Sequence, residues 1–245
     1  MSTFLLYAFL FSVGSVIGWV IEVFFRHWFS SSNPEHRWVN PGFCIGPYLP
    51  LYGFGLCILF FMAEIVKKYD MNRAAEWLLA LFLIAVLLTA LEYAAGIFLI
   101  KVANVRLWDY SKMPGNINGL VCPLFTTFWV LLGMLYYIAI HSHILGAVAW
   151  LASNLAFSFV IGVFYGVFSI DVGYSVNFVS KVKTFADENG LVVKYEELKH
   201  AAYERRMERK EKMKFFFNLP PVNALHDTLE QYRSNIEEKL HTIDK

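Results

Sequence analysis

The hydrophobic pattern of this chain is a succession of long apolar runs separated by short polar segments. Five runs contain about 20 mostly apolar residues, which is the length a helix needs to cross the hydrocarbon core of a bilayer. Lipid offers no hydrogen-bond partners to the backbone, so each run is expected to be helical. The sequence therefore predicts an all-α polytopic membrane bundle of about five transmembrane helices, over roughly residues 4–25, 48–66, 75–100, 121–140 and 144–170.

The charged residues are concentrated in the last part of the chain. Residues 1–180 hold eight Lys or Arg and eight Asp or Glu, whereas residues 181–245 hold thirteen and twelve. Overall the chain is 57% apolar and 17% charged, against about a quarter charged in soluble domains. We predict a transmembrane domain over 1–180 and a charged helical tail over 181–245. The net charge of +1 hides this division.

The tail pattern predicts a charged helix over about 195–217, which ends in three phenylalanines and a Pro220-Pro221 break. A solvated hairpin, closed by a second helix over 222–241, accounts for its mixed charges. The alternative is a basic helix that lies on an anionic leaflet. The mixed charges, without any recognised nucleic-acid motif, argue against a nucleic-acid partner.

The number of spans decides which loops share a face of the membrane. Five spans place the loops at 26–47 and 101–120 on one face with the tail, and those near 67–74 and 141–143 on the other. Cytoplasmic loops carry an excess of Lys and Arg, so the long loops and the tail are predicted to be cytoplasmic, at the cell membrane. The comparison sets Arg26, Arg37, Lys101, Arg106 and Lys112, together with the basic tail, against Lys67, Lys68 and Arg73.

Two stretches of the membrane domain read alike. The first, over about 4–66, runs from a helix with Glu22 through a Gly/Pro-rich loop into a second helix. The second, over about 75–140, does the same with Glu92. A pair of helices returns to the face it left, so the two copies are predicted to be parallel repeats, an arrangement known among transporters. The alternative is a chance likeness between two loops rich in glycine and proline.

Both carboxylates stand inside spans, where an ionisable residue costs on the order of 2.5–3.5 kcal/mol and invites a functional hypothesis. Glu92 lies about nine residues, or about 13 Å, before Lys101 at the helix end. It is therefore predicted to face other helices or to meet a polar partner. Glu22 has a local partner in Arg26, four residues further on, which is a sufficient structural reason for its presence.

Two stripes of small residues predict close helix packing. Gly14 and Gly18 share one face of the first helix with Glu22, so that a neighbouring helix can approach closely. The fifth span carries a similar stripe at Asn154, Ser158, Gly162 and Gly166.

Several other polar residues are expected to be structural. Glu64, near a span end, and His141 and His143, in the predicted short loop, are expected to be solvated. Two histidines without further ligands are a poor metal signal, and no metal or cofactor is predicted. Three cysteines are too few for a disulfide framework; they are expected to be buried filler, with a Cys44–Cys122 thiol pair as the alternative.

The two Gly/Pro-rich loops break the helical pattern. Broken backbone at membrane depth occurs only where protein buries it or water lines it, so such loops indicate a binding site or a re-entrant segment. Interfacial turns with Trp38, Trp108 and Tyr110 in the aromatic belt are the alternative, and both can hold together. Asp171 is expected to end the fifth span and could meet both loops, although a plain helix-end turn would explain it. The candidate site residues are Glu92, Glu22, Asn40, Gly42, Pro47, Tyr48, Arg106, Trp108, Asp109, Tyr110, Asn118 and Asp171.

Two blocks of residues form a recognisable pattern. The first block is Gly18-Trp19 with Glu22, then Asn40-Pro41-Gly42-Phe43 and Gly46-Pro47-Tyr48; the second is Glu92-Tyr93, Trp108-Asp109-Tyr110-Ser111, Asn118-Gly119 and Cys122. Together they resemble the Putative ABC-transporter type IV (CmpB-like) family, over about residues 5–180. The resemblance implies a permease-like membrane component. These 245 residues contain no G-x-x-x-x-G-K-[ST] phosphate loop, so they cannot supply the ATPase themselves.

The leading hypothesis is a multi-pass permease or permease-like subunit. In it Glu22, Glu92 and the two loops line a polar site between the repeats, open to the cytoplasm. The lipid bilayer is the expected partner, and a separate subunit or ATPase and a homo-oligomer are left open.

Two other classes of function are alternatives. The first is a membrane scaffold or regulatory subunit that acts through its tail; truncation near Lys181 would then abolish function, whereas changes at Glu92 would not. The second is an intramembrane lipid-modifying enzyme, with Glu92 and Asp109 as acid and base and Arg106 on an anionic head group. No nucleophile, metal or phosphate motif supports an enzyme, and no catalytic residue or cofactor is predicted.

Overall fold

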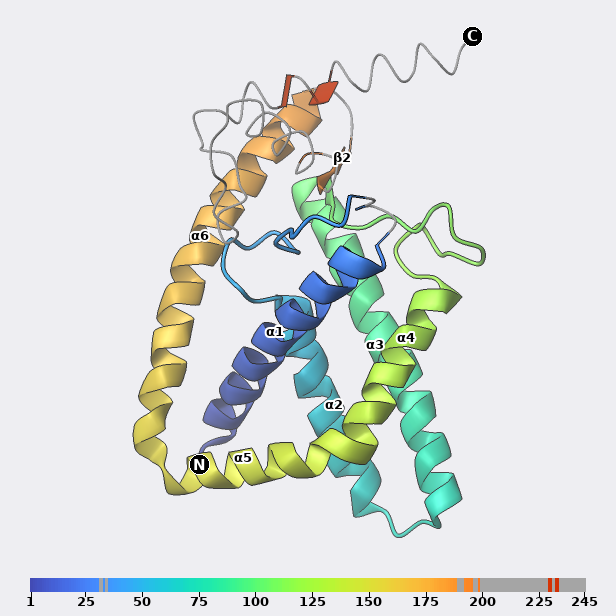
Figure 1. Cartoon of the computed structure of the whole chain (residues 1–245), viewed down its shortest axis with the longest axis vertical. Coiled ribbons are helices and arrows are strands. Elements are labelled where there is room, and N and C mark those ends of the chain that lie inside the picture. The colour runs from blue at the N-terminus through green and yellow to red at the C-terminus, as the bar shows by residue number, and fades with distance from the viewer. Residues whose placement is uncertain are drawn as a thin grey trace. The chain divides into compact units, whose positions relative to one another are not determined.

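The structure is a computed structural model that describes residues 1–30, 33, 35–188, 192–195, 198, 229–230 and 232–233. The helices are α1 (Thr3–Trp28), α2 (Pro50–Lys68), α3 (Arg73–Ala103), α4 (Pro123–Leu135), α5 (His141–Ser153) and α6 (Ser158–Glu188) (Figure 1). A π-helical turn, η1 (Tyr136–Ile140), joins α4 to α5, and a 3-10 turn, η2 (Leu155–Phe157), joins α5 to α6. Two short strands, β1 (Val105–Arg106) and β2 (Val193–Lys194), pair in parallel.

Five helical stretches of the described chain are long and apolar enough to cross a membrane. They are Thr3–Trp28, Pro50–Lys68, Arg73–Val102, Pro123–Ser153 and Leu155–Thr184. The predicted all-α membrane bundle is therefore confirmed. The predicted charged helix and hairpin of the tail, with Phe215, Phe216, Phe217, Pro220 and Pro221, lie almost entirely outside the described residues.

The chain packs into two compact units, each of which is described by itself. Unit 1 comprises residues 1–21, 48–95 and 110–169, and unit 2 comprises residues 22–47, 96–109 and 170–245. The long helices α1, α3 and α6 each contribute residues to both units.

In unit 1, α1 and α2 cross at the distance that only glycine permits. A Cβ atom at Gly18 would lie 2.1 Å from the Cβ of Tyr52, and one at Gly14 would lie 2.7 Å from the Cβ of Leu56. On the facing side, a Cβ at Gly53 would lie 2.8 Å from a backbone oxygen of α1. The close approach predicted at Gly14 and Gly18 is confirmed, and the helix that makes it is α2.

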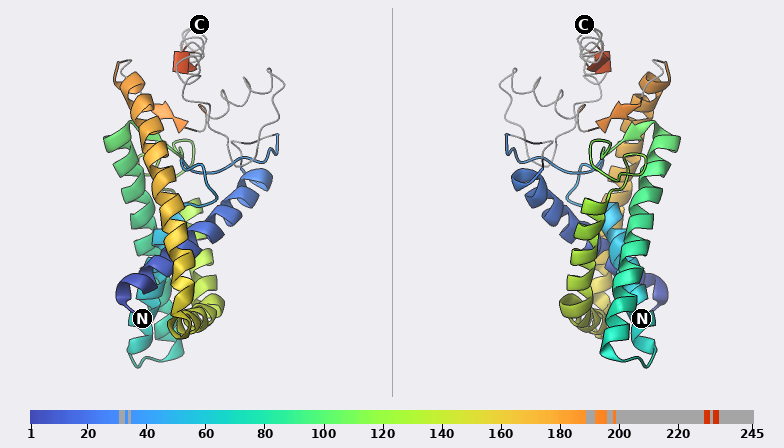
Figure 2. Two further views of the ribbon diagram at one scale, coloured as in Figure 1. Left: turned by 90° about the vertical axis from the view of Figure 1, so that its left-hand side faces the viewer. Right: turned by 90° about the vertical axis from the view of Figure 1, so that its right-hand side faces the viewer.

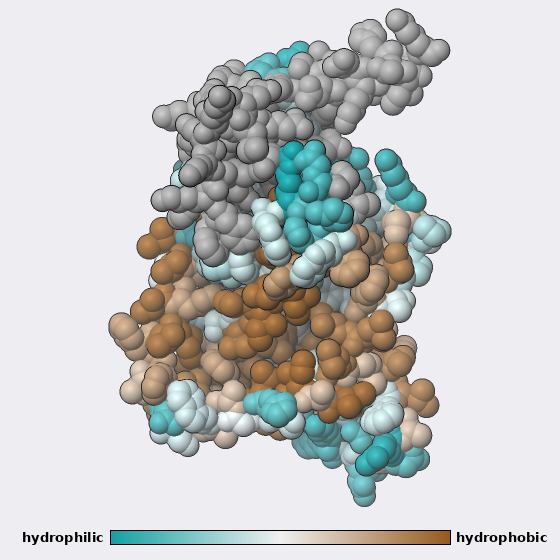
Figure 3. Space-filling model, in the orientation of Figure 1, coloured by the Kyte–Doolittle hydropathy of each residue, from teal (hydrophilic) through white to brown (hydrophobic). Residues whose placement is uncertain are grey.

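The helices α2, α3 and α4 lie side by side around the core of unit 1 (Figure 2). Gly133 brings α4 against α3, because a Cβ there would lie 2.4 Å from the Cγ2 of Ile84. The buried core between these helices includes Leu59, Met62, Ala63, Val66, Ala80, Ile84, Leu88, Tyr136 and Tyr137. Apolar side chains cover most of the visible face over α4, and hydrophilic residues gather at the α2–α3 turn (Figure 3).

The chain bends at η1, after which α5 runs across the direction of α2 and α3 (Figures 1 and 2). The loop predicted at 141–143 is therefore wrong. Its three residues are polar, but none is a glycine or proline, and a polar side chain alone does not interrupt helical backbone. The helix ends instead at Asn154, whose φ of −126° and ψ of 55° are not helical.

The helix α6 begins later and ends later than the predicted fifth span, at Ser158 and Glu188. Asp171 is therefore inside a helix and not at its end. The packing predicted for Gly162 and Gly166 is not found among the described residues, because a Cβ at either position would meet none of their atoms within 4 Å. That face of α6 is exposed and turned away from the other described helices of unit 1.

Unit 2 has a small apolar core of its own. Phe178 and Val182 of α6 pack there with Val105 of β1 and Val193 of β2, which face each other in the strand register. Described tail residues complete this cluster, namely Tyr195, Leu198, Leu229 and Tyr232.

Candidate functional site

In unit 1 the buried carboxylate of Glu92 is bound by a side chain of the second loop. The Tyr110 hydroxyl donates a hydrogen bond of 3.1 Å to Glu92 Oε1. The Tyr110 ring stacks on Phe125 of α4, with 4.4 Å between centroids and 12° between planes. Glu92 is only 3% exposed, so the prediction that it faces protein and meets a polar partner is confirmed.

The next residue of α3 holds the other side of the same loop. The Asn118 side-chain amide donates a 2.8 Å hydrogen bond to the hydroxyl oxygen of Tyr93. Asn118 and Gly119 have φ angles of 54° and 66°, as the two central residues of a type I′ turn require, and Asn-Gly is the pair that tolerates them best. The Asn-Gly motif is therefore a backbone requirement of a loop that attaches to α3 at two adjacent residues.

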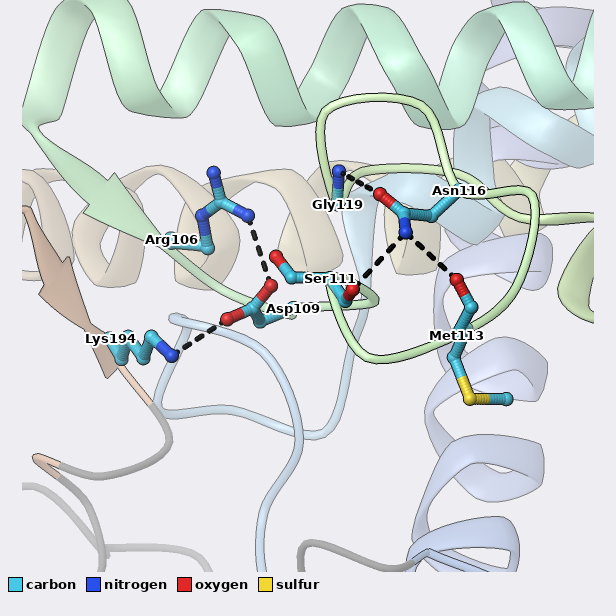
Figure 4. Close-up of polar contacts among 7 residues, drawn as sticks. All are labelled: Arg106, Asp109, Ser111, Met113, Asn116, Gly119 and Lys194. Carbon is cyan, nitrogen blue, oxygen red and sulfur yellow. Dashed lines mark hydrogen bonds and ion pairs between the residues drawn. The ribbon is translucent and has the colours of Figure 1, made fainter. Parts of the chain in front are cut away.

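Asn116 organises the interior of this loop (Figure 4). Its side-chain amide donates to the backbone oxygens of Ser111, at 3.2 Å, and Met113, at 2.8 Å. Its carbonyl oxygen accepts the backbone N–H of Gly119 at 3.0 Å. The backbone N–H of Tyr110 donates to the Gly119 oxygen at 2.8 Å, so hydrogen bonds within the loop hold the residue that contacts Glu92.

A pair of hydroxyl groups lies one helical turn before Glu92. Thr89 of α3 and Thr126 of α4 are 3.2 Å apart at their Oγ1 atoms, which is hydrogen-bonding distance. This pair was not predicted from the sequence. The only signal was a threonine three residues before Glu92, on the same helical face, and nothing in the chain pairs it with residue 126.

In unit 2 Asp171 binds the first loop. Its carboxylate accepts the backbone N–H groups of Ile45, at 3.1 Å, and Gly46, at 2.7 Å, and the hydroxyl of Ser175 at 3.0 Å. Asn40 closes the same loop by donating to the Ile45 oxygen at 2.6 Å. The alternative of a plain helix-end turn is wrong for Asp171, which holds two consecutive amides of the loop.

The loop also needs its glycine. Gly42 has a φ of 73°, in the left-handed region that side chains with a Cβ rarely adopt. The Asp171 carboxylate occupies the place at the Ile45 and Gly46 amides where an anion would bind, so it positions the loop rather than leaving an anion site there.

Glu22 has the local partner that the sequence predicted. Its Oε1 lies 3.0 Å from the Nε of Arg26, with both side chains largely buried. This i,i+4 ion pair is a structural reason for a carboxylate near the end of α1.

The start of the second loop carries a compact charge cluster in unit 2. Asp109 lies between Arg106, at 3.1 Å, and Lys194, at 2.7 Å (Figure 4). The two cations stand opposite each other on β1 and β2, where like charges would repel without the shared carboxylate. Trp108, which precedes Asp109 in the chain, is half-buried. The Arg106 guanidinium is thus paired with Asp109. The hypothesis of a lipid-modifying enzyme needs the same guanidinium to bind a lipid head group.

The predicted site residues therefore form groups within the units. Glu92, Tyr110 and Asn118 come together in unit 1, whereas Tyr48 is buried elsewhere in that unit, against Phe164 and Phe168. In unit 2 the groups are Asn40 and Gly42 with Asp171, the loop-ending Pro47, the Glu22–Arg26 pair, and the charge cluster of Arg106 and Asp109 with neighbouring Trp108. Cys44 and Cys122 are both buried, as expected of apolar filler.

The family model described as Putative ABC-transporter type IV matches residues 9–176 of the chain. The chain belongs to this family. All twelve predicted site residues fall inside the matched region of this type IV protein, and the described tail residues fall outside it. Comparisons with curated proteins and with solved structures found no match. Family membership and the membrane-spanning helices make the chain a transporter-related membrane protein.

One polar residue of unit 1, His141, was expected to be solvated and is not, whereas Glu64 and His143 are exposed as expected. His141 is fully buried, with its Nε2 3.2 Å from Glu64 Oε1 and its Nδ1 2.9 Å from the Tyr136 hydroxyl. The prediction of a solvated loop histidine is wrong, because residue 141 lies on a helix that turns its side chain inward. Sequence reasoning had no signal for the contact, which pairs residues 77 positions apart.

Proposed function

We propose that the chain is a permease-like membrane subunit whose polar site is built around Glu92. The burial of this carboxylate in the third span carries the proposal, because an ionisable group there is costly unless it serves a purpose. The Glu92 carboxylate accepts a hydrogen bond from the hydroxyl of Tyr110, which stands on a loop and not on its own helix.

A bound solute could replace the Tyr110 hydroxyl as the hydrogen-bond donor to Glu92. A solute that carries an ammonium group, another strong donor or a proton would compete with it for the Glu92 carboxylate, and a charged donor makes roughly twice as strong a hydrogen bond. The loop is attached to α3 by side-chain hydrogen bonds at Glu92 and Tyr93. If a solute donor replaced the Tyr110 hydroxyl at Glu92, one of these two hydrogen bonds would be lost, and the loop would loosen where it covers the carboxylate. Solutes of this class are therefore the ones the site would take.

The hydroxyl pair of Thr89 and Thr126 supports a polar path beyond Glu92. It lies between α3 and α4, one turn further into the span. A solute donor released from the carboxylate would meet these two oxygens next. Beyond these hydroxyls, Gly133 and Ile84 make a tight apolar contact. In this conformation that contact would block the passage of a solute.

The first loop and Asp171 are proposed to be the counterpart, within unit 2, of the second loop and Glu92 within unit 1, as the parallel-repeat hypothesis requires. Asn40, Gly42 and Asp171 shape that loop as Asn116, Asn118 and Gly119 shape the second. Both loops are proposed to face the cytoplasm of the cell membrane, since the basic residues are more numerous on their side of the spans. A separate ATPase subunit is compatible with the family but is not required by the site.

Binding by a library of solutes tests the proposal directly. Purified wild type and the Glu92→Gln variant would be heated in the presence of amino acids, polyamines, sugars, nucleosides and inorganic cations. A ligand that binds only the folded state raises its stability by about 2.7 kcal/mol at a hundredfold excess over Kd. We expect at least one donor-bearing class to stabilise wild type and the exposed-turn control Asp70→Asn, but not Glu92→Gln. Equal stabilisation of wild type and Glu92→Gln by every active solute would remove Glu92 from the site.

A scaffold or regulatory subunit that acts through its tail is the second candidate. The observation in its favour is the burial of Tyr195, Leu198, Leu229 and Tyr232 in the core of unit 2. Tail residues that were only solvated would not be so packed. If this candidate holds, Tyr232→Ala abolishes function in cells while Glu92→Gln does not; the permease proposal expects the reverse order.

A further inference from the structure

A continuous chain of hydrogen bonds links three ionisable side chains of unit 1. Glu64 near the end of α2 contacts His141 Nε2 at 3.2 Å, and His141 Nδ1 contacts the hydroxyl of Tyr136 at 2.9 Å. These residues are distinct from Glu92 and its loop. The inference drawn from them holds whether or not the chain moves a solute.

Of these three side chains, Glu64 alone is exposed in the part of the protein that the structure describes. The imidazole of His141 is 0% exposed and Tyr136 is 4% exposed, whereas about half of the Glu64 side chain is exposed, at 49%. The ring of Phe60 stands 5.6 Å from the imidazole and helps to close its surroundings. Water therefore reaches the carboxylate, and the imidazole lies behind it.

The two contacts assign the hydrogen positions of the neutral imidazole. An ionised carboxylate only accepts hydrogen bonds, so Nε2 carries the hydrogen that is donated to Glu64. Nδ1 then has a lone pair, which accepts the hydroxyl hydrogen of Tyr136. This assignment satisfies both ring nitrogens and leaves one place for a further proton, on Nδ1.

We propose that Glu64, His141 and Tyr136 form a proton-binding site. A hydronium ion at Glu64 gives up one proton to the carboxylate and becomes water, and the imidazole takes this proton on its unprotonated nitrogen when the ring turns that nitrogen toward Glu64. In the loaded state both ring nitrogens carry hydrogen, Nε2–H donating to the carboxylate and Nδ1–H donating to the oxygen of Tyr136. The site gains one positive charge, and the hydroxyl of Tyr136 changes from donor to acceptor.

The π-helical turn connects this exchange to the backbone. Tyr136 is the first residue of η1, and the backbone N–H of His141 donates to its carbonyl oxygen. The same two residues are therefore joined by a backbone bond and by a side-chain bond, across five positions. Single π turns inside α-helices are frequent at functional sites, and this one stands where the chain bends from α4 into α5. A proton on His141 changes the side-chain bond that spans the bend.

Other ionisable groups surround the site from every neighbouring helix. On α2, Lys67 opposes a charge on the imidazole and Cys57 lies near Tyr136. On η1, Tyr137 donates to Glu76 of α3, and Lys67 lies over its ring at 5.5 Å. On α1, Tyr7 accepts the Cys57 thiol at its backbone oxygen. Burial of the imidazole disfavours its charged form most, Lys67 disfavours it further, and the Glu64 carboxylate favours it.

Nitrogen-15 NMR of the full-length chain in lipid nanodiscs tests the proposal, with histidines labelled and the proton as the ligand. The His141→Gln variant assigns the signals, and His143→Gln, which changes an exposed histidine two residues along the same helix, is the matched control. At about pH 8 the two ring nitrogens of His141 should differ widely in shift, as the Nε2–H form requires, and by about pH 5 they should converge as the ring is charged.

The carboxylate should set the proton occupancy. In Glu64→Gln the ratio of charged to neutral imidazole at a given pH should fall about tenfold, because the charged partner at 3.2 Å is lost. The variants His143→Gln and Glu92→Gln should leave the ratio unchanged. Two results would overturn the proposal: neutral His141 shifts that do not move over this pH range in wild type, or the same occupancy in wild type and Glu64→Gln.

Discussion

The crossing of α1 and α2 yields the sharpest prediction about the architecture. The substitution Gly18→Ala adds one methyl group 2.1 Å from the Cβ and the Cγ of Tyr52. Ordinary carbon contacts lie at about 3.5 Å or more, so the two helices must separate by roughly 1.4 Å at this point. The atoms that clash are at the root of the tyrosine side chain, so rotation of the ring does not relieve the contact.

The chain supplies a matched control for the chemistry of the change. Gly162→Ala makes the same substitution in another span of unit 1, where a Cβ meets no atom within 4 Å. Both changes reduce the freedom of the unfolded chain, which by itself stabilises by about 0.4–1 kcal/mol. Overpacking a closely packed contact costs about 1–3 kcal/mol. Gly18→Ala should therefore lose about 1–2 kcal/mol, and Gly162→Ala should lose nothing or gain slightly.

The assay is thermal unfolding of the purified full-length chain in nanodiscs, at one fixed scan rate because membrane proteins commonly unfold irreversibly. For a chain of this size 1 kcal/mol corresponds to about 2–4 °C, so Gly18→Ala should lower the apparent Tm by roughly 2–8 °C. Gly162→Ala should stay at or above wild type. A Gly18→Ala variant as stable as wild type, or equal losses for both variants, would refute the crossing.

Three further predictions concern the loops. Asp171→Asn replaces a carboxylate that accepts two backbone amides, and each hydrogen bond to a charged group contributes about 1.5–3 kcal/mol. The two amides should therefore exchange hydrogen at least tenfold faster, as measured by mass spectrometry; unchanged exchange would contradict the contact of Asp171 with the loop. Tyr110→Phe should lower the apparent Tm by about 2–4 °C through loss of about one hydrogen bond, while Tyr69→Phe, at an exposed position, should not; equal values would sink the proposed contact. Asn118→Ala should be less stable than Asn118→Gly, because only glycine also accepts the left-handed φ; the reverse order of Tm would show that the turn is not as described.

The spans and the position of Glu92 could be predicted because both depend on local properties. Twenty apolar residues identify a span wherever they occur, and the cost of a buried carboxylate indicates a polar partner without naming it. The partner itself could not be predicted. Tyr110 looked like an interfacial aromatic residue, and only the folding of its loop, through Asn116 and the Asn118-Gly119 turn, brings its hydroxyl to Glu92.

Two differences show where local patterns are insufficient. The glycine stripes at Gly14/Gly18 and Gly162/Gly166 have the same spacing, yet only the first meets another helix in the described structure. Spacing shows that a close contact is permitted, whereas tertiary structure decides whether it forms. His141 was assigned to a loop because its neighbours are polar, but the backbone there is helical and the side chain points inward.

Solute flux in proteoliposomes tests the central claim most directly. Wild type, Glu92→Gln and the control Asp70→Asn would be reconstituted at equal amounts, and loaded with the donor-bearing solute that stabilises the wild type best. The account predicts that wild type and Asp70→Asn move this solute at similar rates, while Glu92→Gln moves it at least tenfold more slowly, a barrier difference of about 1.4 kcal/mol. Flux through Glu92→Gln at the wild-type rate would contradict it.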